Sequence, residues 1–335
     1  MKMTKLLAVA AIAGFAGCGQ SNLGGSQIIE EGQPPVVIHS TVEAAQAARE
    51  AAGTGVVGDA RGTAGTSSNL SYHGGVGGIG VETAPKVYVV WWGSQWACSN
   101  NAPTSDPSGE AGIQQSFFNH AGGSSWANSV TQYCQGVASG TFFCNGAGQA
   151  AGNQTNQLAG VWCDGSSLPK RISQSALAGE ATRAAAHFGN TSAASNASVQ
   201  YVISTPSGHN SSGFGTQFCA WHSSTSSTSG NIAYTNMPYI TDAGASCGAN
   251  FNGLGPNAGI TIVGGHEYAE TISDQFPNGG WLDSGGAENG DKCAWISSGQ
   301  GASASVSMNG ASFPVQSLWS NAFNGGAGGC VLSYP

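Results

Sequence analysis

The sequence predicts an α/β fold with α+β elements, in which a mixed sheet is flanked by helices and followed by a disulfide-stapled, glycine-rich C-terminal part. Apolar runs typical of strands alternate with segments of helical spacing, which favours layered α/β structure over an all-β sandwich. Glycine provides 53 of the 335 residues, more than twice the ordinary share of about 7%, and so predicts many turns. The 9 Trp, 8 Tyr and 12 Phe residues supply anchors for a core.

Charge is scarce in this chain. Charged residues make up 8% of it, and 9 Lys and Arg against 17 Asp and Glu give a formal net charge of −8. Nucleic acid is excluded as a partner, because its recognition needs a basic surface. A hydrophobic share of 40% excludes a highly charged, disordered chain.

The first 18 residues have the pattern of a targeting segment. Two lysines precede the apolar run 6–13, which is too short for a transmembrane helix and is typical of a secretory signal. Residues 15–18, Phe-Ala-Gly-Cys, resemble the lipobox of bacterial lipoproteins, in which the cysteine is lipidated; cleavage after Ala16 is the alternative. Lipidation is favoured because the chain has 9 Cys, and setting Cys18 aside leaves an even number.

The eight remaining cysteines predict disulfides. Paired thiols suit an oxidising compartment, so we expect an extracellular protein or an outer-surface or periplasmic lipoprotein. Metal ligation is disfavoured because the cysteines lack the spacings of a zinc site. The pairs expected from proximity in sequence are Cys219–Cys247, Cys293–Cys330, Cys98–Cys134 and Cys144–Cys163.

The chain divides into a signal (1–18), a flexible tether or pro-segment (19–84) and one folded domain (85–335). Residues 19–84 are polar and glycine-rich apart from a helical-looking stretch at 42–50. The domain is expected to begin with a buried strand at Lys86–Gly93, where the chain becomes strongly apolar.

The remaining elements follow from periodicity and turn residues. Helix formers with apolar positions at helical spacing predict helices, and short apolar or β-branched runs predict strands. The expected elements are helices at Ala111–His120 and Ile172–Phe188, strands at Leu158–Trp162 and Val199–Ile203, a polar loop at Ser223–Gly230, an edge strand at Asn231–Tyr239, and short strands with glycine-rich turns beyond Gly290.

Acidic residues gather near the C-terminal third of the chain. Six of the 17 acids fall within the 25 positions from Glu267 to Asp291, with no Lys or Arg among them. Close acids without countercharges favour a bound metal ion, and a solvated acidic face is the alternative. The other four are Glu270, Asp274, Asp283 and Glu288.

A five-residue motif, His-Glu-Tyr-Ala-Glu at 266–270, follows an apolar run in a predicted helix. His266 and Glu270 are neighbours at positions i and i+4 of that helix. This is the spacing of the zincin HExxH helix, in which both histidines bind zinc and the intervening glutamate is the general base. The motif, here HExxE, therefore predicts a zincin-like site with His266 and Glu270 as ligands and Glu267 as catalytic base.

A hydrolytic zinc site needs a third protein ligand and an open position. Glu288 and Asp291 follow His266 by 22 and 25 residues, similar to the interval at which gluzincins supply their glutamate ligand. Glu288 is preferred over Asp291, and the second acid of the pair is a candidate to orient His266. Asp274 is disfavoured because it lies about 12 Å along the same helix. We expect Zn²⁺, although carboxylate ligands also suit other divalent metals such as Mn²⁺ or Ca²⁺.

Several segments together form a family pattern. They are Val87-Tyr88-Val89-Val90-Trp91-Trp92-Gly93, Phe218-Cys219-Ala220-Trp221-His222, Gly265-His266-Glu267-Tyr268-Ala269-Glu270, Trp281, Glu288-Asn289-Gly290-Asp291-Lys292-Cys293, Val315-Gln316-Ser317-Leu318-Trp319 and Cys330. In order and spacing they resemble the plant EXORDIUM-like, or phosphate-induced, secreted proteins and their bacterial relatives. The resemblance implies an extracellular, disulfide-bonded protein and agrees with Glu288 and Asp291 over Asp283. The family is associated with growth control at plant cell walls, and the resemblance implies no particular reaction.

His222 is a further candidate site residue, since it belongs to one of these segments. It is a candidate catalytic group that donates a hydrogen bond to a transition state, or a further metal ligand. Packing beside a disulfide is the alternative. The other histidines, interpreted as structural or surface residues, are His39 and His73 in the expected tether, and His120, His187 and His209.

The leading functional hypothesis is a secreted or lipid-anchored metal-dependent hydrolase, a zinc metallopeptidase of the zincin type. We expect a monomer that acts on a peptide or protein and that meets a membrane only through a lipid at Cys18. An open cleft over His266 and Glu267 would favour this hypothesis over a capped, structural ion.

Two alternatives belong to other functional classes. One is a non-catalytic extracellular or cell-wall-associated binding protein of the EXORDIUM-like type with a structural metal site. The other is a carbohydrate-binding or adhesive protein that uses exposed Trp92, Trp96 and Trp126.

Overall fold

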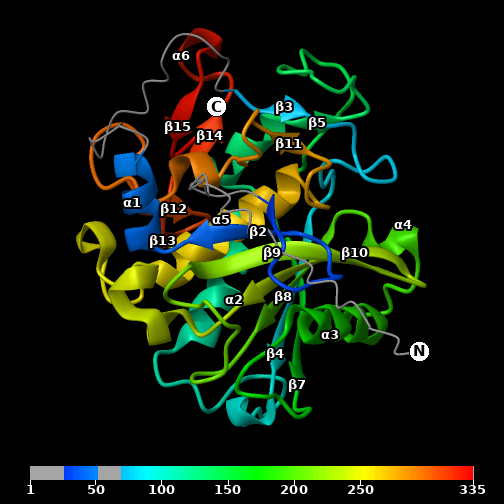
Figure 1. Cartoon of the computed structure of the whole chain (residues 1–335), viewed down its shortest axis with the longest axis vertical. Helices are drawn as coiled ribbons and strands as arrows, with labels where there is room; N and C mark the ends of the chain where they lie inside the picture. The colour runs from blue at the N-terminus through cyan, green and yellow to red at the C-terminus, as the bar shows by residue number, and fades with distance from the viewer. Residues whose placement is uncertain (1–25, 52–68, 335) are drawn as a thin grey trace, which may run out of the picture.

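The computed structural model describes residues 26–51 and 69–334, so the predicted signal and Cys18 lie outside the described residues. A seven-stranded mixed sheet forms its centre (Figure 1). From edge to edge its strands are β1 (Ser26–Gln27), β2 (Val36–Ser40), β9 (Phe218–Ser227), β10 (Gly230–Met237), β8 (Val199–Ser204), β4 (Lys86–Trp92) and β7 (Leu158–Asp164). The last four are parallel to one another, whereas β1, β2, β9 and β10 pair antiparallel.

The apolar run of β4 explains its central place in the sheet. Val87, Val89 and Trp91 pack into the core on one face, and Val90 and Trp92 pack into a second core on the other. Alternate side chains of a strand point to opposite faces, so a strand covered on both faces is apolar throughout. The predicted mixed α/β class is confirmed.

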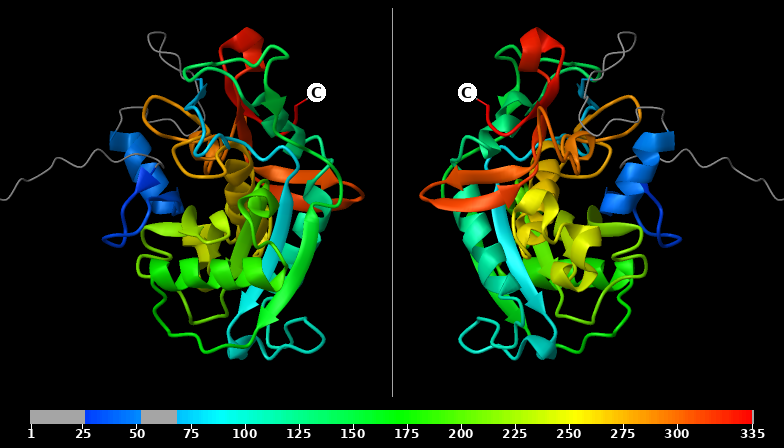
Figure 2. Two further views of the ribbon diagram at one scale, coloured as in Figure 1. Left: turned by 90° about the vertical axis from the view of Figure 1, so that its right-hand side faces the viewer. Right: turned by 90° about the vertical axis from the view of Figure 1, so that its left-hand side faces the viewer.

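Helices cover both faces of the sheet. The helix α3 (Gln174–His187) packs on β8, β9 and β10, and its N-cap Ser173 accepts a hydrogen bond from the Ala176 N–H. The helices α2 (Glu110–Ala121) and α5 (Ala258–Ser273) lie on the opposite face. The hairpin of β12 and β13 extends sideways from the sheet beside α2 and packs on α5 (Figure 2).

The helix α5 is buried along its whole length. It lies between β9 of the sheet on one side and α2 and β13 on the other. Gly265 permits this close packing, because a Cβ atom there would lie 3.2 Å from the rings of Phe117 and Trp126. The polar residues of this helix therefore have no access to bulk water and need partners inside the protein.

The expectation of a flexible tether at residues 19–84 is wrong for the part that is described. Val36–Ser40 is a fully buried strand that pairs with β9, and the helix α1 (Val42–Ala51) follows it. Three consecutive β-branched residues, Val-Val-Ile at 36–38, provide the strand propensity within an otherwise polar stretch. Residues 69–84 also pack on the domain, where β3 (Ser71–Tyr72) pairs with β11 (Trp281–Leu282).

Most predicted elements are present, and two need correction. The strands at 86–93, 158–162 and 199–203, the helices at 111–120 and 172–188 and the helix predicted around the motif at 266–270 are confirmed as β4, β7, β8, α2, α3 and α5. The polar loop expected at Ser223–Gly230 is wrong, because β9 continues to Ser227 and pairs with β10. The strand expected at Asn231–Tyr239 is β10, which is internal rather than an edge, because β9 and β2 extend the sheet beyond it.

Short elements complete the described part of the chain. The remaining strands are β5 (Cys134–Gln135), β6 (Gln149–Ala150), β12 (Ala304–Met308), β13 (Ala311–Val315), β14 (Leu318–Ser320) and β15 (Gly329–Val331). The remaining α-helices are α4 (Ala193–Asn196) and α6 (Phe323–Gly326). The 3₁₀ turns are η1 (Ser94–Trp96), η2 (Ala127–Gln132), η3 (Ile240–Cys247), η4 (Phe251–Gly253) and η5 (Asp291–Cys293). The short strands and turns expected beyond Gly290 are thus confirmed.

Four disulfides join the eight cysteines of the domain. Cys219–Cys247 and Cys293–Cys330 are as predicted. The other two expected pairs are wrong, since Cys98 bonds Cys163 and Cys134 bonds Cys144. Strand β4 pairs with β7, so Cys98, which follows β4, comes close to the end of β7. This contact between distant segments, rather than proximity in sequence, determines which cysteine Cys98 bonds.

Two further observations bear on the functional alternatives. Within residues 26–51 and 69–334, no helix is long and apolar enough to cross a membrane. Trp92, Trp96 and Trp126 are 3%, 0% and 0% exposed, so the expectation of exposed tryptophans for carbohydrate binding is wrong. Their rings pack in the hydrophobic core instead.

Candidate metal centre

The fold brings all six predicted site residues together in the interior. They come from three parts of the chain: β9, α5, and the loop that leads from β11 into η5. A seventh titratable side chain, from β2, joins them. The seven are His39, His222, His266, Glu267, Glu270, Glu288 and Asp291, each at most 1% exposed.

The HExxE spacing sets the first contact of the site. His266 and Glu270 lie one turn apart on α5, with 3.0 Å between Nε2 of the histidine and Oε2 of the glutamate. The Asp291 N–H donates to Glu270 Oε1 at 2.8 Å, and Asp291 Oδ1 lies 3.8 Å from His266 Nε2. Gly290 permits this close approach of the loop, because a Cβ there would lie 2.7 Å from His266 Nδ1.

Gln316 fixes the orientation of His266. Its Oε1 lies 3.3 Å from His266 Nδ1, and its Nε2 donates to the Gly290 carbonyl at 2.8 Å. An amide oxygen is an acceptor only, so Nδ1 carries the proton and Nε2 keeps a free lone pair. Such a partner on the second ring nitrogen is typical of metal-binding histidines.

His222 has a similar arrangement on β9. Its Nδ1 lies 3.1 Å from Glu267 Oε2 and 3.6 Å from Glu270 Oε2, and its Nε2 lies 3.5 Å from Glu288 Oε1. The two histidines therefore approach the same oxygen of Glu270 from two different elements, a strand and a helix.

Many polar atoms of this cluster have no hydrogen-bond partner among the described residues. They are both ring nitrogens of His39, Nε2 of His222 and of His266, Oε1 of Glu267, Oε2 of Glu270, both carboxylate oxygens of Glu288 and Oδ1 of Asp291. Buried polar atoms are nearly always paired, so a convergence of this many unpaired atoms indicates a missing partner.

The electrostatics of the cluster point to the same conclusion. Burial raises the pKa of all four carboxyl groups, that of Glu270 to about 8. Burial alone would lower the pKa of His222, but Glu288 and Glu267 raise it well above its usual value. Burial lowers the pKa of His266. Without a cation, the carboxyl groups of the cluster are thus shifted toward their protonated forms.

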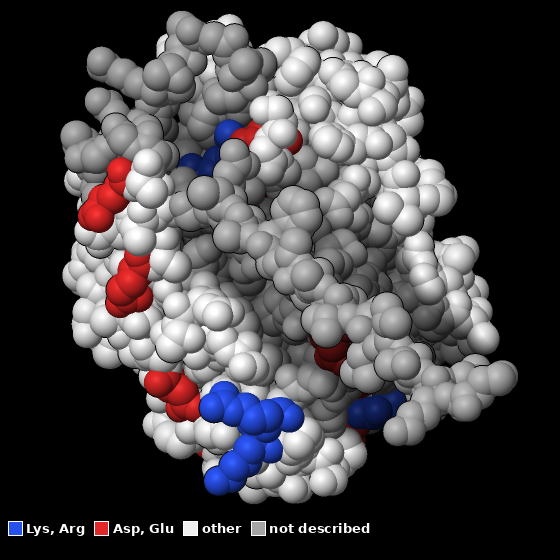
Figure 3. Space-filling model, viewed as in Figure 1, with Lys and Arg blue, Asp and Glu red and all other residues white. Residues whose placement is uncertain are grey.

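The basic side chains of the described residues do not supply the missing charge. Lys292 pairs with Asp283 at 2.7 Å, and Arg183 pairs with Asp164 and Glu180. On the face seen in Figure 3, Lys, Arg, Asp and Glu occupy only small, scattered patches. The acidic cluster is buried, and neither of these two basic side chains pairs with it.

The donor set fits a divalent cation. Three groups of side chains place one donor atom each within 4.8 Å of the others: His266 with Glu270 and Asp291, His222 with Glu270 and Glu288, and His39 with His266 and Glu267. Ligands about 2.0–2.2 Å from a tetrahedral zinc ion lie about 3.3–3.6 Å from one another, within the range of the distances above. Imidazole and carboxylate donors together suit zinc, and also manganese.

The geometry separates the two candidate third ligands. Asp291, rather than the preferred Glu288, groups with His266 and Glu270, while Glu288 groups with His222. Asp274 instead accepts hydrogen bonds from the N–H groups of residues 278–280 beyond the end of α5. Asp283 pairs with Lys292 outside the cluster.

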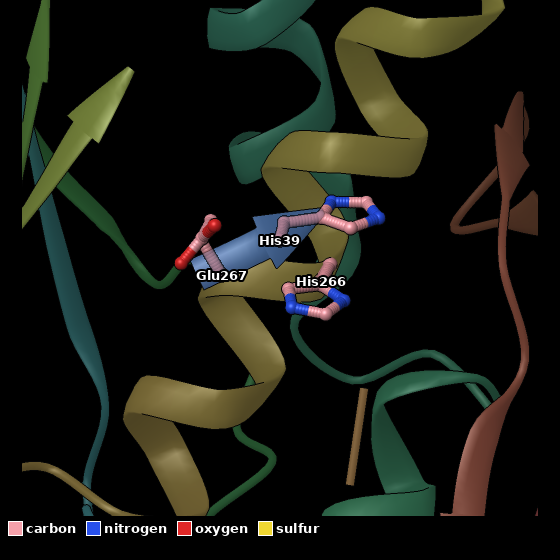
Figure 4. Close-up of side chains that lie close together, drawn as sticks. All are labelled: His39, His266 and Glu267. Atoms are coloured by element: carbon pink, nitrogen blue, oxygen red, sulfur yellow. The ribbon is translucent and has the colours of Figure 1, made fainter. Parts of the chain in front are cut away.

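His39 is the member of the cluster that the sequence interpretation missed. The sequence pattern places His39 in the expected tether, but β2 lays its ring on the face of the His266 ring, with centroids 3.8 Å apart and an angle of 4° between the planes (Figure 4). It also stacks on Trp295. The lone pairs of the two rings lie in nearly parallel planes, so His39 and His266 do not point at one ion, and the group of His39, His266 and Glu267 suits a cation less well than the other two groups. The run at 36–38 is the only local signal that could have placed His39 inside.

Comparison of the chain with protein-family models, with curated proteins and with solved structures finds no match in any of the three. The resemblance to EXORDIUM-like proteins therefore stays a prediction from the motifs quoted above.

Proposed function

We propose that this protein is a divalent-metal-dependent hydrolase of the zincin type, with peptides as its substrates. The observation that carries the proposal is the convergence of unpaired, buried donor atoms from His266, Glu270 and Asp291, with the Glu267 carboxyl group beside them. These three donors leave a divalent ion nearly neutral in charge, because two of them are carboxylates.

Each residue has a defined task in this proposal. A divalent ion held by the three ligands supplies Lewis-acid activation of a carbonyl group. Glu267 has one oxygen, Oε1, without a partner among the described residues, and burial raises its pKa, as a general base requires. It accepts the proton of an attacking water molecule and returns it to the amine leaving group. His222 donates to the other oxygen of Glu267 and holds it in place.

Access to the centre depends on the N-terminal segment. Every residue of the cluster is at most 1% exposed, and the ring of His39, on β2, stacks on the ring of His266. The α1 residue Arg49 donates to the Ala294 carbonyl and holds the same segment against the loop after η5. We infer that the described conformation is latent and that residues 26–51 move before a peptide reaches Glu267, which accords with the pro-segment interpretation.

A non-catalytic protein with a structural metal ion is the second candidate. The complete burial of the cluster favours it, because a structural ion is enclosed whereas a catalytic one keeps an open position. In both cases the four disulfides are compatible with an extracellular protein, as the motif resemblance also implies.

The test compares peptide hydrolysis by the zinc-loaded parent with that of Glu267→Gln. A second background carries Ile38→Asp, which weakens the anchoring of β2 and opens the centre. We expect cleavage of a peptide library in at least the opened background, and a loss of roughly 100-fold or more in Glu267→Gln without loss of zinc. Glu31→Gln, at an exposed glutamate, is the matched control and should behave like the parent.

Mass spectrometry of the peptide library provides the readout, and elemental analysis of the same samples provides the zinc content. Equal cleavage by the parent and Glu267→Gln would refute the role of Glu267. Zinc bound without cleavage in either background would replace the hydrolase by the structural-metal candidate.

A further inference from the structure

We infer that the cluster binds a second divalent cation, held by His222, Glu270 and Glu288, so that Glu270 bridges a pair of ions. The inference rests on the proposed function in that it takes His266, Glu270 and Asp291 as the first site. It adds a two-metal centre to the single-ion site expected from the HExxE motif.

The contacts of the two histidines separate the donors into two groups. His266 Nε2 approaches Glu270 at 3.0 Å and Asp291 at 3.8 Å. His222 approaches Glu270 at 3.6 Å through Nδ1 and Glu288 at 3.5 Å through Nε2. Glu270 is common to both groups and lies between them. A bridging carboxylate is a usual feature of paired sites, in which two ions lie about 3.5–4 Å apart.

The unpaired atoms of the second group point to a ligand of their own. Nε2 of His222 and both oxygens of Glu288 have no hydrogen-bond partner among the described residues, although both side chains are at most 1% exposed. His222 Nδ1 is held by Glu267, which leaves Nε2 directed at Glu288. A carboxylate on one ring nitrogen and a cation on the other is the arrangement typical of a metal-bound histidine.

Charge balance also favours a second cation when the four carboxyl groups are ionised. The cluster contains four carboxyl groups, Glu267, Glu270, Glu288 and Asp291, and the ion pairs of Lys and Arg in the described part of the chain lie elsewhere. One divalent ion would leave two negative charges in a site that water does not reach, which is costly. Two divalent ions balance the four carboxylates when the histidines are neutral. The donor types, imidazole and carboxylate, suit Zn²⁺ or Mn²⁺.

The experiment counts metal ions per chain. The full chain is stripped with a chelator, dialysed against Zn²⁺ or Mn²⁺, freed of loose ions by gel filtration and analysed by elemental mass spectrometry. We expect about two ions per chain for the parent and for the control Glu31→Gln. We expect about one for Glu288→Gln and about one for Asp291→Asn, each of which removes a charged ligand from one site with little change in shape.

The possible outcomes separate this inference from the proposed function. One ion in the parent with both metals, or two ions retained in Glu288→Gln, would overturn the second site and leave the hydrolase proposal intact. No ion in the parent would overturn both. If Glu288→Gln does not fold, as judged by circular dichroism, the count for the parent still decides between one ion and two.

Discussion

Two residues outside the expected ligand set orient the histidines of the metal centre. Gln316 occupies Nδ1 of His266, and Glu267 occupies Nδ1 of His222. Both rings therefore keep Nε2 for a cation. The sequence could not reveal the role of Gln316, because the contact joins positions 50 residues apart and depends on how the C-terminal strands pack on α5.

Glu82 is a buried carboxyl group that lies outside the metal centre. Its Oε2 accepts a hydrogen bond from Gln200 Nε2 at 2.9 Å, and its Oε1 has no partner among the described residues. Burial raises the pKa of Glu82 to about 8, which exceeds the opposing effect of the Gln200 hydrogen bond. The Tyr268 hydroxyl is the titratable group that interacts with it electrostatically.

The raised pKa of Glu82 predicts a pH-dependent effect of Glu82→Gln. Folded Glu82 keeps its proton up to about pH 8, whereas in the unfolded chain the same group ionises near pH 4.5. Protonated Glu82 therefore contributes to the stability of the fold at low pH, and this contribution is lost as the pH rises from about 4.5 to about 8. A glutamine keeps the hydrogen bond and has no charge. The Tm of Glu82→Gln should therefore be close to that of the parent near pH 5 and several degrees higher at pH 9.

Thermal unfolding followed by circular dichroism at both pH values measures this difference. The effect is worth roughly 1.4 kcal/mol for each unit by which the pKa is raised, and Tm changes by roughly 2–4 °C per kcal/mol in a domain of this size. A difference in Tm that is the same at pH 5 and pH 9 would mean that folded Glu82 is already ionised.

At the scale of elements, β2 and the hairpin of β9 and β10 show which strand pairings the local sequence pattern does not predict. The strand β2 pairs with β9, whose residues lie more than 170 positions away. The serine-rich end of β9 forms a strand because backbone hydrogen bonds to β10 hold it, although its side chains are typical of a polar loop. Both errors concern pairing between strands, which depends on partners rather than on local composition.

The strand β2 also predicts how the metal centre opens. Ile38 is 6% exposed and packs in the core between the sheet and α3, whereas Ile28, which directly follows β1, is 63% exposed. An aspartate at position 38 places a charge without a partner in that core and costs several kcal/mol of β2 docking. Because 1.4 kcal/mol corresponds to a factor of ten, Ile38→Asp should release bound zinc to a chelator at least roughly 10-fold faster than the parent.

A coloured chelator added to the zinc-loaded protein reports this rate directly. Ile28→Asp makes the same chemical change at an exposed position of the same segment and should release zinc at the rate of the parent. A rate for Ile38→Asp equal to that of both other chains, in a protein that stays folded, would show that β2 does not control access to the centre.

For the whole molecule, the sequence predicted the class of fold and the residues of the site better than it predicted which of these residues contact one another. The α/β layers follow from strands and helices with strong periodicity, such as β4 and α3. Five of the six predicted site residues meet because the HExxE spacing is local to α5 and the acids at 288 and 291 lie close to it in sequence, whereas His222 joins them from β9.

Several details of the site and of the disulfides depend on long-range geometry. The choice between Glu288 and Asp291 depends on how the loop before η5 turns at Gly290 against His266. The pairing of Cys98 with Cys163 depends on β4 lying beside β7. His39 joins the centre only because β2 extends the sheet past β9. Apart from the β-branched run directly before His39, these contacts have no signal within a few residues of the side chain concerned.

The central claim is that the cluster on α5 is a metal centre, and anomalous diffraction at the zinc absorption edge tests it most directly. Crystals of the zinc-loaded full chain should show strong anomalous density within about 2.0–2.2 Å of His266 Nε2 and of a Glu270 oxygen. The density should be absent from data collected just below the edge. A map without a peak at the cluster, from zinc-soaked crystals that diffract well, would contradict the account.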